Sequence, residues 1–134
     1  MTIYVLDTNV VSFIVKEHPL VTHRYELLAR PENKFLGCPL VWFEVRRGLI
    51  AKDAKNQMLR FEIIFAAFDW EDYSRADWEL AAQLWAQRKV SGRPIHDADL
   101  LIAVFAMNRN AVFVTDNEKD FDGLGVTVEN WKQT

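Results

Sequence analysis

Short apolar runs alternate along this chain with longer segments in which apolar residues recur at helical spacing. Compact runs rich in β-branched and aromatic residues are typical of buried strands. Such runs occupy residues 3–6, 35–38, 67–70, 112–114 and 126–128. The pattern therefore predicts five short strands.

Helical spacing dominates most of the sequence between these runs. Helices are predicted over residues 10–16, 40–52, 56–65, 75–90 and 97–108. Ser74 followed by Asp77 forms a capping box that starts the fourth of these helices. The fifth is apolar nearly all round, so we expect it to be buried on several sides. Strands that alternate with helices through short connections predict an α/β fold around a mainly parallel sheet.

Length and composition narrow the class of protein. The chain has 134 residues, the size of one ordinary domain, so we expect residues 1–134 to form a single domain. Half of the residues are apolar, and the one cysteine, Cys38, excludes a disulfide framework and a cysteine-rich zinc site. No apolar run is long enough to cross a membrane, and the first residues lack the pattern of a signal peptide. The expected location is the cytoplasm.

Acidic side chains follow the predicted strands or lie in unusually apolar surroundings. Asp7 comes directly after the first strand, and Asp116 and Asn117 come after the fourth. Glu44 and Asp99 lie in helices among large apolar residues, where a charge is costly unless it is paired or binds a metal. Ligands of parallel sheets bind at the carboxyl ends of the strands. We therefore expect these side chains to converge on an all-oxygen site suited to Mg²⁺ or Mn²⁺.

Each of these residues also has an ordinary structural interpretation. Asp7 alone is typical of a helix cap, Glu44 of a half-exposed helical residue, and Asp99 of an acid in a first helical turn. Two other enzyme and signalling classes fit poorly. Haloacid-dehalogenase phosphatases need a second aspartate at position 9, which is Asn9, and receiver domains need an acidic pair at the first strand, which is absent.

Four motifs in order resemble those of PIN-domain ribonucleases over essentially the whole chain. They are residues 5–9 (VLDTN), Glu44 followed by Gly48, residues 99–103 (DLLIA) preceded by Arg93 and Pro94, and residues 114–121 (VTDNEKDF). The similarity is greatest to VapC-type toxins of toxin–antitoxin pairs, which are single PIN domains of this size. It implies a three-layer sandwich around a five-stranded, mainly parallel sheet.

The resemblance also implies an activity. A VapC-type protein is a Mg²⁺- or Mn²⁺-dependent endoribonuclease that cuts tRNA or rRNA. The resemblance further implies a homodimer that a VapB-like or related antitoxin neutralises in a heterotetramer or a larger assembly. The candidate metal ligands are Asp7, Asp99, Glu44 and Asp116, and the candidate catalytic set adds Asn117.

One position departs from the family pattern. Within the fourth motif the family pattern is Thr-x-Asp/Asn, and its third residue, counted from Thr115, is Asn117 here rather than an acid, with Asp116 before it. Either residue can fill the fourth position of the site, because an amide oxygen also binds a metal or a water molecule. The departure leaves a second hypothesis open, namely a non-catalytic PIN-fold binding module with a decayed metal site.

Charge and aromatic content bear on the partners. The formal net charge is −3, so a polyanionic substrate must be held by local bases. Candidates near the motifs are Arg46, Arg47, Arg88, Lys89 and Arg93. Five Trp and nine Phe exceed what a small interior readily buries, so we expect an apolar surface patch that serves the dimer or the antitoxin.

Overall fold

Five strands and six α-helices make up the fold in the computed structural model, which describes residues 1–133. The strands are β1 (Thr2–Leu6), β2 (Asn33–Gly37), β3 (Asp69–Trp70), β4 (Val112–Val114) and β5 (Val128–Glu129). The helices are α1 (Thr8–Val15), α2 (Pro19–Leu28), α3 (Pro39–Ala51), α4 (Lys55–Ala66), α5 (Arg75–Val90) and α6 (Asp97–Asn108). A 3₁₀ helix, η1 (Glu118–Phe121), follows β4.

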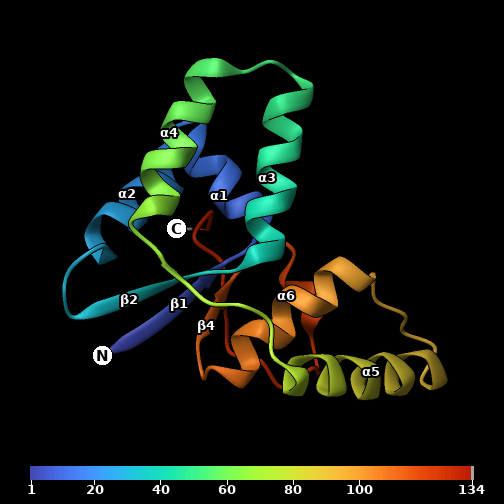
Figure 1. Cartoon of the computed structure of the whole chain (residues 1–134). Coiled ribbons are helices and arrows are strands. Elements are labelled where there is room, and N and C mark those ends of the chain that lie inside the picture. Colours follow the sequence, from blue (N-terminus) through green and yellow to red (C-terminus); the bar gives the residue numbers. More distant parts are fainter. Residues whose placement is uncertain (134) are drawn as a thin grey trace.

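All strand pairs in the sheet are parallel, and β1 lies at its centre. The strand order is β3-β2-β1-β4-β5, so β1 contacts β2 on one side and β4 on the other. Figure 1 shows α1 to α4 on one side of the sheet and α5 and α6 on the other. The predicted α/β sandwich is therefore confirmed, with a sheet that is wholly parallel. After β1 the chain adds β2 and β3 on one side of β1, and it then adds β4 and β5 on the other side. The order of the strands therefore reverses between β1 and β4.

Most predicted elements are confirmed, and one helix was not predicted. Helix α2 begins at Pro19 after His18, whose ring nitrogen accepts a hydrogen bond from the Val21 N–H at 3.4 Å. Val21 is its only buried residue, so it carries no apolar stripe that a sequence pattern could reveal. The strand predicted at 67–70 shortens to β3, and the one predicted at 126–128 is shorter and shifted by one residue at its end, to Val128–Glu129 in β5.

The core surrounds α6 and the first and fourth strands. Residues 102–106 of α6 are completely buried, which confirms the prediction that this helix is covered on several sides. Cys38 is buried and unpaired. Within residues 1–133 no helix is both long and apolar enough to span a bilayer.

Both edges of the sheet are formed by very short strands. Strand β3 contributes two residues, Asp69 and Trp70, and both are exposed. Strand β5 at the opposite edge also has two residues. Few unpaired backbone groups are therefore presented along either edge of the sheet.

A buried ion pair joins the start of α5 to the end of α6. The capping box is confirmed, since the Ser74 N–H donates to Asp77 Oδ2 at 2.9 Å. Asp77 is nevertheless more than a helix-start acid, because it is 0% exposed and accepts two Arg109 hydrogen bonds at 3.0 Å. Asn108 donates a further bond to it at 2.8 Å. Burial acts to raise the pKa of Asp77, but the Arg109, Ser74 and Asn108 hydrogen bonds lower it below its usual value.

Replacing Asp77 by Ala should lower the free energy of unfolding by about 3 kcal/mol, because Arg109 would lose its buried partner and keep only the partly exposed Glu71, at 3.4 Å. Urea denaturation at neutral pH measures this. The control is Glu79→Ala, which breaks the exposed Arg75–Glu79 pair (3.0 Å) on the same helix and should cost no more than about 0.5 kcal/mol. Equal losses in the two variants would contradict a structural role for the buried pair.

Candidate active site

Asp7 lies at the carboxyl end of β1, beside the end of β4. Its backbone N–H donates to the Val114 carbonyl at 2.8 Å, and its side chain caps α1, with Oδ1 accepting the Thr8 N–H at 2.8 Å. Thr115, the residue after β4, donates its hydroxyl proton to Asp7 Oδ2 at 2.7 Å. The carboxylate is 4% exposed, and both of its oxygens are therefore held in place. Asp7 is a helix cap, as its position suggests, but it is also aimed into the strand-end region.

Glu44 reaches the same region from α3. The Thr8 hydroxyl donates to Glu44 Oε1 at 2.7 Å, so Thr8 links this side chain to Asp7. Glu44 Oε2 lies 3.6 Å from a guanidinium nitrogen of Arg47. The role of Thr8 was not predicted, although its place directly after Asp7 is a usable signal, because such a residue can bridge a cap to the next helix.

Asp99 lies in the first turn of α6. It is the third carboxylate of the group, with Asp7 and Glu44 as the other two. Burial raises the pKa of Asp99, with the negative charges of Asp120 and Glu44 adding to the effect and His96 opposing it. Burial also raises the pKa of Asp7, to about 6. The hydrogen bonds from Thr115 and Thr8 oppose that rise, and the charges of Asp99 and Glu44 increase it. The charges of Asp7, Glu44 and Asp99 therefore act on one another, and Thr8 links the first two through its hydrogen bonds.

Asp116 and Asn117 lie beside this group in different ways. Asp116 Oδ2 lies 3.8 Å from Lys132 Nζ, in an ion pair with the C-terminal segment. The Asn117 N–H donates to the Thr115 hydroxyl at 3.1 Å, and its own side chain is exposed at the start of η1. Asn117 therefore supports, through its backbone, the hydroxyl that holds Asp7.

Asp120 is a further acid of the site that the sequence did not single out. It lies in η1 and raises the pKa of Asp99 through its charge. Residues three apart in a 3₁₀ helix lie above one another. Asp120 therefore lies on the same side of η1 as Asn117, the residue that caps this helix. The signal in the sequence is an acid three residues after Asn117, within the fourth motif.

Two arginines fix the backbone around Asp120. Arg88, near the end of α5, donates to the carbonyls of Asp120 at 2.9 Å and Asp122 at 3.2 Å. Arg93 also donates to the Asp122 carbonyl, at 3.3 Å. These guanidinium groups, predicted as candidates for holding a polyanion, hold η1 and the turn after it in the structure. The α5 helix thereby positions an acid that lies more than thirty residues away in the sequence.

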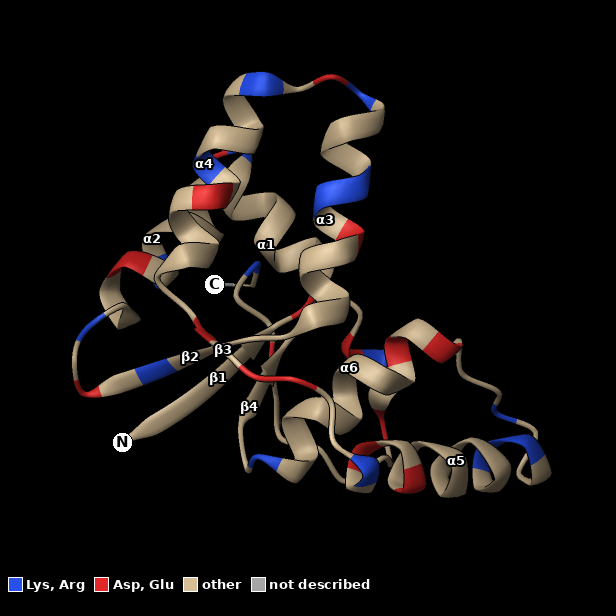
Figure 2. Ribbon diagram, in the orientation of Figure 1, with Lys and Arg blue, Asp and Glu red and all other residues tan. Residues whose placement is uncertain are grey.

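The donor chemistry of the site is carboxylate throughout. In the part of the chain that the structure describes, no three His, Cys, Asp or Glu side chains are preassembled as a metal cage. The carboxylates instead form a loose group, in which mutual repulsion favours a proton or a cation. Figure 2 shows acidic segments at the start of α6 and on α3, where a basic segment follows directly.

The sequence and the fold match known proteins over nearly the full length. The PIN domain family matches residues 4–126. The chain belongs to the PIN domain family. Ribonuclease VapC2 of Rickettsia felis is 30% identical over 132 residues, which is 96% of this chain and 98% of that protein. The resemblance carried by the four motifs is thus confirmed.

Two further relatives extend this comparison. The tRNA(fMet)-specific endonuclease VapC of Shigella flexneri is 28% identical over 96% of this chain and 97% of its own. The crystal structure of VapBC2 from Rickettsia felis, bound to a DNA fragment from its promoter, contains a chain that matches this PIN domain with a TM-score of 0.87. Identity there is 28%, with 97% of this chain and 99% of that chain covered.

Replacing Asp7 by Asn should stabilise the metal-free protein above about pH 6. An acid whose pKa rises from 3.8 to about 6 on folding costs stability once it is ionised, so the wild type should weaken as the pH rises from 4 to 6. The shift corresponds to about 3 kcal/mol, and a lost hydrogen bond offsets about 1 kcal/mol of it.

Thermal unfolding at pH 4 and pH 8 in a chelating buffer measures the difference between the two proteins. Asp116→Asn is the matched control, because that carboxylate is partly exposed and paired with Lys132. A fall in the melting temperature of Asp7→Asn at pH 8 would show that the carboxylate serves the fold rather than a ligand.

Proposed function

We propose that this PIN domain is a metal-dependent endoribonuclease toxin that hydrolyses phosphodiester bonds in tRNA or rRNA. The observation that carries the proposal is the buried Asp7 carboxylate at the end of β1, which Thr8 links to Glu44 and whose pKa is raised to about 6 by burial and by the charges of Asp99 and Glu44. A structural role alone does not require three acids that repel one another. Relatives named as ribonucleases and as a tRNA endonuclease support the substrate class.

The donor set suits Mg²⁺ or Mn²⁺, because every candidate ligand atom is an oxygen, from a carboxylate or, at Asn117, from an amide. We propose Asp7, Asp99 and Glu44 as ligands, with Asp120 as the fourth acid in addition to the candidates Asp116 and Asn117. A bound cation would supply charge neutralisation for the phosphodiester and its transition state. Residues of the chain would hold the ligands: Thr115 and Thr8 fix both oxygens of Asp7.

Glu44 is suited to orienting the attacking water. The Thr8 hydroxyl occupies its Oε1, which leaves Oε2 on the side of Arg47 to accept a proton from the water molecule. In the hydrolysis, water oxygen bonds to phosphorus, the bond from phosphorus to the 3′ oxygen breaks, and that oxygen takes up a proton. The products would be a 5′-phosphate and a 3′-hydroxyl.

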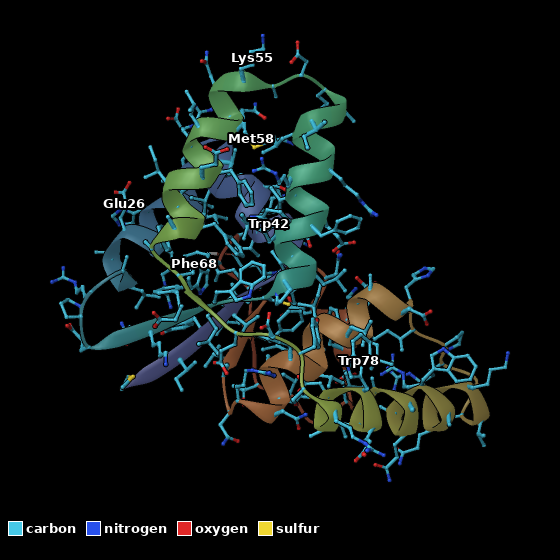
Figure 3. The ribbon with its side chains drawn as sticks, viewed as in Figure 1. Glu26, Trp42, Lys55, Met58, Phe68 and Trp78 are labelled. Carbon is cyan, nitrogen blue, oxygen red and sulfur yellow. The ribbon has the colours of Figure 1, made fainter. Side chains whose placement is uncertain are left out.

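Partners and location follow from the same proposal. We propose neutralisation by a cognate antitoxin, since solved relatives of this fold are toxin–antitoxin assemblies. Trp78 and Trp85, each more than two-fifths exposed, lie with α5 and α6 around an apolar groove and are candidates for the expected homodimer contact (Figure 3). The 134 residues would act as one domain in the cytoplasm, where cellular RNA is available.

The second hypothesis, a non-catalytic module, is favoured only by Asn117. Asp120 supplies an acid near Asp99 that compensates for this amide. A calorimetric titration with Mn²⁺ separates the two hypotheses, because a decayed site would show no saturable binding.

Asp99→Asn and Asp120→Asn should each lower the rate of RNA cleavage by about 10²–10³-fold, because each removes charge that positions a cation against the developing negative charge. Asp116→Asn should change the rate by only a few fold, since Asp116 is paired with Lys132. Single-turnover cleavage with saturating Mn²⁺ measures all three rates. A larger loss in Asp116→Asn than in Asp120→Asn would return the fourth position to Asp116.

A further inference from the structure

The arginines near the acidic site already have partners, among them Arg47, which lies 3.6 Å from Glu44. Arg46 pairs with Glu62 at 3.4 Å and lies over the Trp42 ring, which Figure 3 shows on the side of α3 that faces α4. Arg88 and Arg93 bind the backbone around Asp120. An RNA strand that enters an acidic site on a chain with net charge −3 therefore needs other groups to hold its phosphates.

A narrow groove runs away from the site between α1 and α3. The two helices are joined at the site by the bond from Thr8 to Glu44, at 2.7 Å. The cavity between them has a volume of about 80 Å³. Its polar and small lining residues are Ser12, Lys16, Glu44, Gly48, Lys52 and Gln57. Pockets that enclose a whole small molecule are several times larger, so this groove suits a chain that passes over it and inserts one group.

Each wall of the groove ends in a lysine. Along α1, Thr8 and Ser12 are followed by the C-cap residue Lys16 at intervals of four residues, and along α3, Glu44 and Gly48 are followed by the C-cap residue Lys52 at the same intervals. Each series runs from the site through a small residue to a lysine. At about 1.5 Å per residue, the lysines lie about 12 Å from the site along the helix axes.

Both lysines are available to a ligand. Lys16 and Lys52 are exposed, and neither forms an ion pair with any described acidic side chain. The neighbouring acid Glu17 is instead 4.0 Å from Arg60. Two ammonium groups without a described ion-pair partner therefore line the same groove, at the ends of α1 and α3 that are away from the site.

Gly48 keeps the middle of the groove open. A Cβ atom added at this position would meet nothing within 4 Å, so packing does not require glycine there. Glycine inside a helix costs roughly 0.5–1 kcal/mol relative to alanine. The residue lies one turn beyond Glu44 on the wall of the cavity, where a side chain would fill the space.

We propose that the groove between α1 and α3 binds the sugar–phosphate backbone of single-stranded RNA beside the scissile bond. Lys16 and Lys52 bind a phosphate one or two nucleotides away, and Ser12 and Gly48 leave room for the strand between that phosphate and the acids. The inference rests on the proposed ribonuclease function and assigns its substrate path. It also explains two features together, namely the lack of ion-pair partners for Lys16 and Lys52 and the presence of a glycine at position 48 that packing does not require.

The first test measures binding of a short mixed-sequence single-stranded RNA to the cleavage-deficient Asp7→Asn protein at several salt concentrations. Adding Lys16→Gln and Lys52→Gln should weaken binding about tenfold at low salt and reduce the slope of log K against log salt by roughly 0.7 for each phosphate that is no longer neutralised. Lys34→Gln is the control, because Lys34 lies at the start of β2, away from the carboxyl ends of the strands. An unchanged slope in the double variant, or an equal change in the control, would overturn the inference.

The second test fills the groove without removing a charge. Gly48→Leu should raise KM about tenfold and leave kcat within a few fold, while the melting temperature stays equal or rises, because leucine is the better helix former. Wild-type KM in a stable Gly48→Leu protein would overturn the groove as the substrate path. Loss of antitoxin binding with normal RNA cleavage in the lysine variant would assign the groove to the protein partner instead. Absence of cleavage and RNA binding in the wild type would overturn the ribonuclease proposal itself.

Discussion

A carboxylate buried at the end of the central strand is the constraint around which this protein is organised. Ionised Asp7 is costly in its position, and the chain offsets that cost with two donors, the Thr8 N–H and the Thr115 hydroxyl. The Thr115 bond ties β1 to β4, and Thr8 ties the same point to Glu44 on α3. The sheet, α1 and α3 therefore meet at one carboxylate. Its remaining cost, seen in a pKa raised to about 6, is what a cation would relieve.

The sequence predicts those features that depend on local pattern. Five strand positions, most helices and the acids Asp7, Glu44 and Asp99 follow from apolar runs, caps and charges placed among apolar residues. Helix α2 was not predicted, because it buries one residue and has no apolar stripe. The only sequence signal for this helix is Pro19 at its first position, and a proline there is equally typical of a turn.

The parts that the sequence could not predict depend on residues far apart in the chain. Asp77 has the position of an ordinary helix-start acid, and only the fold shows that Arg109, 32 residues later, makes it a buried ion pair. Asp120 joins the site because Arg88, 32 residues earlier, holds its backbone. The choice between Asp116 and Asn117 is local in sequence, yet it depends on Lys132 in the C-terminal segment. Long-range polar contacts thus give several acids of similar sequence context different surroundings in the fold.

The short edges of the sheet restrict how any protein can attach to this one. Adding a strand to a sheet requires a row of free backbone donors and acceptors, and β3 and β5 offer two residues each. A protein partner is then expected to bind side chains rather than a free strand edge. Single substitutions of those side chains can change which partner is bound. Closely related toxins that share one cytoplasm could in this way acquire separate inhibitors, because no common backbone template would make their inhibitors interchangeable.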